Sequence, residues 1–95
     1  MSIQLKNDIT GDSGKAKEVV FSLHLPMHIK HSNHLTRGES DRFEWGSGGK
    51  CDDDRHKVSC KVNIPHETDE HPEIEAQSGD TITVKFSDGN YKLTK

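Results

Sequence analysis

The stretch that decides the fold is residues 81–94, which read TITVKFSDGNYKLT. Apolar and polar side chains alternate on both sides of the dipeptide Asp88-Gly89, and this is the period of a β-strand with one buried face. A two-residue Asp-Gly connection between alternating segments is the strongest short-range hairpin signal, because both turn positions require positive φ. We therefore predict that Thr81–Phe86 and Tyr91–Thr94 pair as antiparallel strands.

The period of two continues through most of the chain. Further alternating rows are Ile3, Leu5 and Ile9; Val19, Phe21, Leu23 and Leu25; and Val58, Cys60, Val62 and Ile64. Turn residues separate the rows at intervals of about 8–12 residues, which is typical of a sandwich or a small barrel. We predict an all-β fold, a small antiparallel β-sandwich that is immunoglobulin-like or jelly-roll-like. It should have roughly seven to eight short strands and occupy residues 1–95 as one domain. The polar segment Thr36–Glu44 is a place where a single helical turn fits.

Residues 79–90, GDTITVKFSDGN, resemble the final hairpin of many immunoglobulin-like domains in their Gly-Asp start and their Asp-Gly turn. The resemblance covers about one-eighth of the chain and implies no site residue. The Cys…Trp…Cys order of the immunoglobulin family is absent, because Trp45 precedes both Cys51 and Cys60.

Composition and charge disfavour several classes of function. The 95 residues include 13 basic and 16 acidic side chains without a basic stripe, so we expect no nucleic-acid partner. No apolar stretch is long enough to span a membrane, and the first ten residues lack the apolar core of a signal peptide. The expected location is the cytoplasm, or outside the cell as a mature secreted form. No nucleophile motif or phosphate-binding loop occurs, so we predict no catalytic residues and a non-enzymatic protein.

Histidine is the residue type that stands out. The chain has seven, and four of them lie within eleven residues: His24, His28, His31 and His34. Neutral imidazole is a preferred ligand of zinc, copper and nickel. On a regular strand His24, His28 and His34 share the face opposite Leu23, Leu25, Met27 and Ile29. A solvated strand face that happens to use histidine is the simpler interpretation, and a pH-sensing role is a third. Our leading functional hypothesis is a binding domain that takes up a divalent Zn, Cu or Ni ion on this His-rich segment.

A second polar segment carries His66 and His71, which are separated by three carboxylates and flanked by prolines. It does not match the helical His-Glu-x-x-His motif, so an inter-strand loop is the simpler interpretation. If this loop folds against the first histidine segment, its two imidazoles become additional metal ligands.

The two cysteines, Cys51 and Cys60, are too few for a disulfide framework or an all-thiolate zinc site. Cys60 has the inward parity of its row, which predicts a core position. The alternatives for the pair are one disulfide across a short loop and two free thiols.

Two rival functions accompany the metal hypothesis. One is a protein- or glycan-recognition module without metal, which would use Trp45 and Tyr91. The other is a thiol-based redox carrier or enzyme that uses Cys51 or Cys60.

Overall fold

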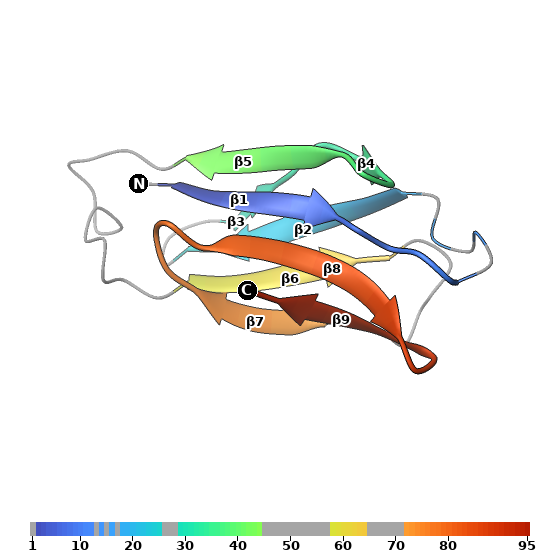
Figure 1. Cartoon of the computed structure of the whole chain (residues 1–95). Helices are drawn as coiled ribbons and strands as arrows, with labels where there is room; N and C mark the ends of the chain where they lie inside the picture. Colours follow the sequence, from blue (N-terminus) through green and yellow to red (C-terminus); the bar gives the residue numbers. More distant parts are fainter. Residues whose placement is uncertain are drawn as a thin grey trace.

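The computed structural model of the protein describes residues 2–12, 14, 16, 18–25, 29–44, 58–64 and 72–95, which form two β-sheets packed face to face (Figure 1). In chain order the strands are β1 (Ser2–Asn7), β2 (Glu18–His24), β3 (Ile29–His31), β4 (Leu35–Thr36), β5 (Ser40–Glu44), β6 (Val58–Asn63), β7 (Glu73–Ala76), β8 (Thr81–Ser87) and β9 (Asn90–Thr94). The described residues contain these nine strands and no helix. The predicted all-β sandwich is confirmed, with more strands than the seven to eight expected.

The two sheets use strands from both halves of the chain. The first sheet has the order β5-β1-β8-β9, and the second has the order β3-β2-β6-β7, with β4 also paired to β2. Among the described strands β1 and β8 run parallel, whereas the other six pairings are antiparallel. A parallel pair needs a long crossover connection, and here the strands of the second sheet supply it. Apart from this one pairing the sandwich is antiparallel, as predicted.

The predicted C-terminal hairpin is confirmed. Strands β8 and β9 pair with Ser87 opposite Asn90, so the turn consists of two residues, Asp88 and Gly89. Their φ angles are 53° and 81°, as a primed two-residue turn requires. The register also places Phe86 opposite Tyr91, and their rings pack at a tilt with centroids 4.8 Å apart.

The core lies between the sheets and contains most of the residues that the alternation predicted. Ile29, which parity placed inward, is instead exposed opposite His24, and Ala16 and Leu35, which belong to no alternating row, are buried. The side chains of Ile3, Leu5, Val19, Phe21, Leu23, Cys60, Val62, Ile82 and Val84 are almost completely buried. Cys60 is a core residue, as its parity predicted. Asn7 occupies an inward position of β1 and is also fully buried. Its side chain stays hydrogen-bonded, because Nδ2 donates to the Leu35 carbonyl at 2.9 Å and Oδ1 accepts from the Ile9 amide at 3.1 Å.

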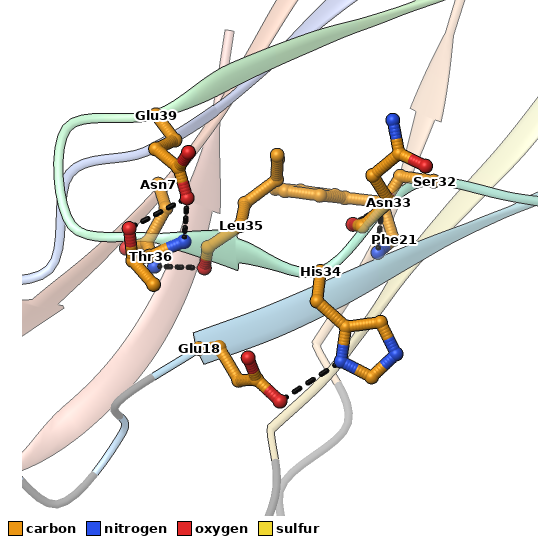
Figure 2. Close-up of polar contacts among 9 residues, drawn as sticks. All are labelled: Asn7, Glu18, Phe21, Ser32, Asn33, His34, Leu35, Thr36 and Glu39. Atoms are coloured by element: carbon orange, nitrogen blue, oxygen red, sulfur yellow. Dashed lines mark hydrogen bonds and ion pairs between the residues drawn. The ribbon is translucent and has the colours of Figure 1, made fainter.

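The helical turn considered for Thr36–Glu44 is not formed. The chain instead leaves the second sheet at β4, turns at Gly38 with a φ of 83°, and enters the first sheet as β5. Figure 2 shows the contacts of this turn, in which Glu39 accepts hydrogen bonds from the hydroxyl and the amide of Thr36. Those two bonds lower the pKa of Glu39. Pairing with β1 overrides local propensity here, because extended backbone buries Phe43 between the sheets.

Candidate functional site

The outer face of the second sheet carries the histidines that the structure describes. Because side chains alternate along β2, the even-numbered residues from Glu18 to His24 point away from the core. The face continues across β6 and β7 through Ser59, Lys61 and the carboxylates of Glu73 and Glu75. His24 and His31 enter it from two neighbouring strands, β2 and β3.

The register between β2 and β3 makes His24 and His31 close neighbours. Ser22 lies opposite His31, and His24 lies opposite Ile29. His24 and His31 are therefore diagonal partners on one face, a relation with Cα atoms about 7–8 Å apart and within reach of long side chains. Strand pairing thus brings together two of the four predicted ligands.

The imidazole of His31 is oriented by a short polar network. Its Nδ1 lies 3.0 Å from the hydroxyl oxygen of Ser22, and Asn63 Nδ2 donates to the same oxygen at 3.1 Å. In the tautomer with the proton on Nδ1, His31 donates to Ser22, and Nε2 keeps its lone pair for a metal ion. A hydrogen bond on the second ring nitrogen is the usual arrangement around metal-ligating histidines.

The imidazole of His34 is also held by a hydrogen bond, but to a residue at the other end of β2. It lies between β3 and β4, and its Nδ1 donates to the Oε1 atom of Glu18 at 2.9 Å (Figure 2). Glu18 and Ser22 are four residues apart on β2, which is about 13 Å along a strand. Ser22 and Glu18, the hydrogen-bond partners of His31 and His34, are separated by that distance. Within the described ranges, no three His, Cys, Asp or Glu side chains form a group that could hold a metal ion.

Several predicted site residues lie outside the described residues. They are His28, Cys51, Trp45, His66 and His71. Metal ligation by these histidines, recognition by Trp45 and the reactivity of Cys51 stay predictions.

Cys60 is unsuited to thiol chemistry. It is a free cysteine in the structure, and burial raises the pKa of its thiol to about 12. A nucleophilic or redox-active cysteine needs a thiol that is accessible and readily ionised. The thiol of Cys60 is neither accessible nor readily ionised. Cys51, its partner in the candidate disulfide, lies outside the described residues; the structure has Cys60 as a free thiol, and thiol titration of the protein tests this.

Tyr91 lies in the core, a position that does not favour the expected recognition role. Its side chain is buried, and its hydroxyl donates to Asp12 Oδ2 at 3.0 Å. The same carboxylate accepts hydrogen bonds from the amides of Gly14 and Ala16, and it forms an ion pair with Arg37. Asp12 thereby joins the β1–β2 connection to β9 and to the turn before β5.

Sequence reasoning missed both polar networks. Asn63 lies 41 residues from Ser22 along the chain, and Tyr91 lies 79 residues from Asp12. No local pattern marks such pairs, because their members meet only after the sheets have formed. The one local signal was the Asp12–Gly14 spacing of a side-chain-to-backbone turn.

The chain matches no protein-family model, no curated protein and no solved structure. Among the described residues there is no helix of the length and apolar character needed to cross a membrane.

Proposed function

We propose that this protein binds a divalent transition metal ion through the imidazoles of His24 and His31. The observation that carries the proposal is their diagonal pairing on the outer face of the second sheet. The backbone hydrogen bonds of two paired strands fix the positions of both Cα atoms. Two imidazoles held at this spacing need little further ordering to reach one ion, which reduces the entropic cost of binding.

The surroundings of the two histidines support this role. Ser22 holds the Nδ1 side of His31, which leaves Nε2 as the ligand atom. The described residues of this face include three carboxylates, Glu18, Glu73 and Glu75, and one ammonium group, Lys61. This excess of negative charge favours the approach of a cation. Imidazole ligands suit zinc, copper and nickel, with copper(II) at the top of the affinity order.

Calorimetric titration of the untagged protein with ZnCl₂, CuCl₂ or NiCl₂ tests the proposal. We expect micromolar affinity for at least one ion. His24→Ala and His31→Ala should each weaken binding about tenfold or more, because each removes one of the two proposed ligands. His34→Ala is the matched control and should bind as the wild type does, since its imidazole belongs with Glu18. Absence of heat with all three ions, or equal binding by the His24→Ala/His31→Ala double variant, would overturn the proposal.

Two further measurements examine the chemistry of the site. Ser22→Ala should weaken binding about tenfold by freeing the ring of His31, although it removes no ligand atom. Lowering the pH from about 7.5 to about 5.5 should also weaken binding, because a protonated imidazole has no lone pair for a metal.

A further inference from the structure

The outer face of the first sheet is basic, although the chain as a whole is acidic. This face consists of the outward positions of β5, β1, β8 and β9 (Figure 1), and each strand places one exposed basic side chain on it: Arg42, Lys6, Lys85 and Lys92, in that order. Glu44 is the one acidic side chain at these outward positions. Four positive charges and one negative charge give the face a formal charge of +3, whereas the whole chain carries −3.

The strand registers bring these basic side chains together. Lys85 lies directly opposite Lys92, a relation with Cβ atoms about 5 Å apart. Lys6 lies opposite Thr83, which makes it the diagonal neighbour of Lys85, and Thr83 in turn lies opposite Thr94. Three neighbouring strands thus place three ammonium groups beside two hydroxyl groups. No local run of basic residues marks this cluster, because its members come from both ends of the chain.

The two basic side chains on the edge strands have carboxylate partners. Arg42 lies 3.5 Å from Glu44, and Lys92 lies 4.0 Å from Asp88. All four side chains are more than half exposed. Ion pairs between exposed side chains contribute little to stability, so an anionic ligand can compete with these two carboxylates.

The two lysines on the inner strands have no such partner. Within the described residues no ion pair joins Lys6 or Lys85 to a carboxylate, although Asp8 follows β1 near Lys85. A basic residue on an edge strand prevents pairing with other sheets, but that explanation does not extend to the inner strands β1 and β8. Like charges directly opposite each other, as in Lys85 and Lys92, also lower stability. This arrangement fits a ligand of opposite charge.

The same face is hollowed beside Arg42. An open concavity of about 520 Å³ is lined by Gln4, Ser40, Asp41 and Arg42, and its volume lies within the range of ligand sites. The carboxylate of Asp41 already accepts hydrogen bonds from the amides of Asn33 and Arg42. The amide, hydroxyl and guanidinium groups of the other lining residues are available to a polar ligand.

The chemistry of the face selects among anionic ligands. Apart from the charged residues, every outward position of β5, β1, β8 and β9 is Ser, Thr, Asn or Gln. The structure describes these strands completely, and their outward positions include no aromatic ring on which a nucleic-acid base could stack. They also include no apolar side chain that could enter a lipid bilayer. An acidic polysaccharide needs neither, because it combines anionic groups with hydroxyl groups along its whole length.

We propose that the outer face of the first sheet binds an acidic polysaccharide. Lys6, Lys85 and Lys92 receive its carboxylate or sulfate groups, and the concavity beside Arg42 receives a neighbouring sugar unit. The four strands together span roughly 14 Å across the sheet, so one polymer chain can contact several basic side chains at once. The site lies on the sheet opposite the histidine pair and does not rest on the proposed metal binding.

Calorimetric titration of the full chain with dextran sulfate, carboxymethyl-dextran and dextran tests this inference. The three polymers share one backbone and differ in their charged groups. We expect binding to at least one of the charged polymers and none to neutral dextran, and the preference between the two identifies sulfate or carboxylate as the anionic group. Raising NaCl from about 0.05 M to about 0.5 M should weaken binding at least about tenfold, because salt screens exposed charges.

Variants of the inner lysines locate the binding face. Lys6→Ser and Lys85→Ser should each weaken binding about fivefold, the effect of one basic side chain near an anionic surface. Lys61→Ser is the matched control and should bind as the wild type does, because Lys61 belongs to the outer face of the second sheet. Lys85→Ser should melt no lower than the wild type, since it relieves the repulsion of Lys92. Weaker binding by this variant therefore cannot come from unfolding.

The outcomes that would overturn the inference are distinct from those for the metal site, because a chelator is present in every titration. Absence of binding to both charged dextrans at low salt would overturn it. Equal losses in Lys61→Ser and Lys85→Ser would show attraction by the overall charge and not by this face, which also overturns it. Tighter binding to oligothymidylate or to phosphatidylserine vesicles than to either charged dextran would assign the face to nucleic acid or to a membrane instead.

Discussion

Replacing Asp12 with Asn tests the buried carboxylate that joins three separate parts of the sandwich. The side chain is fully buried and accepts four hydrogen bonds, from the amides of Gly14 and Ala16, the hydroxyl of Tyr91 and the guanidinium of Arg37. An amide group keeps one oxygen and replaces the other with NH₂, so two of the four donors lose their acceptor. A hydrogen bond to a charged group contributes about 1.5–2 kcal/mol at the lower end of its range. The free energy of unfolding should therefore fall by about 3–4 kcal/mol.

The pH dependence of stability gives a second test of the same residue. Burial, the largest single influence, raises the pKa of Asp12. The hydrogen bonds from Ala16, Tyr91 and Gly14 and the charge of Arg37 outweigh it, and the pKa lies below its usual value of 3.8. A carboxyl group with a lowered pKa in the folded state stabilises the protein above the unfolded value and loses that effect as the pH falls through the folded value. The difference between wild type and Asp12→Asn should therefore shrink below about pH 3.8.

Urea denaturation followed by circular dichroism measures both effects. At neutral pH the variant should also melt at least about 12 °C lower, since 1 kcal/mol corresponds to about 4 °C or more in a domain of this size. Asp8→Asn is the matched control, because Asp8 is an exposed carboxyl group of the same connecting segment. It should change stability by less than about 0.5 kcal/mol. The reasoning is refuted if Asp12→Asn unfolds like the wild type, or if the two variants lose equal stability.

Three further predictions concern the framework. Gly89→Val should lower the free energy of unfolding by about 1–2 kcal/mol in urea denaturation. A Cβ at position 89 would meet no atom within 4 Å, so the loss comes entirely from holding valine at a φ of 81°. Gly89→Asn should recover most of this loss, and a Val variant as stable as the wild type would contradict the turn. The thiol of Cys60 should not react with a disulfide reagent in the native protein at pH 8. It should react once the protein is unfolded, without addition of a reductant. A reaction in the native state would contradict its burial. Asn7→Ala should cost about 2 kcal/mol or more by thermal melting, because it removes the buried side-chain hydrogen bonds to the Leu35 carbonyl and the Ile9 amide. A loss below about 0.5 kcal/mol would show that water replaces the side chain.

The sequence by itself determined the local structure of this protein. Alternation assigned an inward face to each row, because successive side chains of a strand point to opposite sides whatever the strand pairs with. Asp88-Gly89 determined the C-terminal turn for an equally local reason, the positive φ of two consecutive residues. For Thr36–Glu44 the local pattern was too polar to be informative. Pairing with β1 decided that segment.

Only the tertiary structure decided which residues meet across the molecule. The parallel pairing of β1 with β8 and the position of each strand in its sheet depend on packing between segments far apart in the chain. The candidate site follows instead from the pairing of two consecutive strands, β2 and β3. Histidine density indicated a metal ligand set, but the register of β3 on β2 placed His24 beside His31 and left His34 with Glu18. A shift of the register by one residue would turn His31 to the opposite face, so the register of the β2–β3 hairpin, and not composition, creates the candidate site.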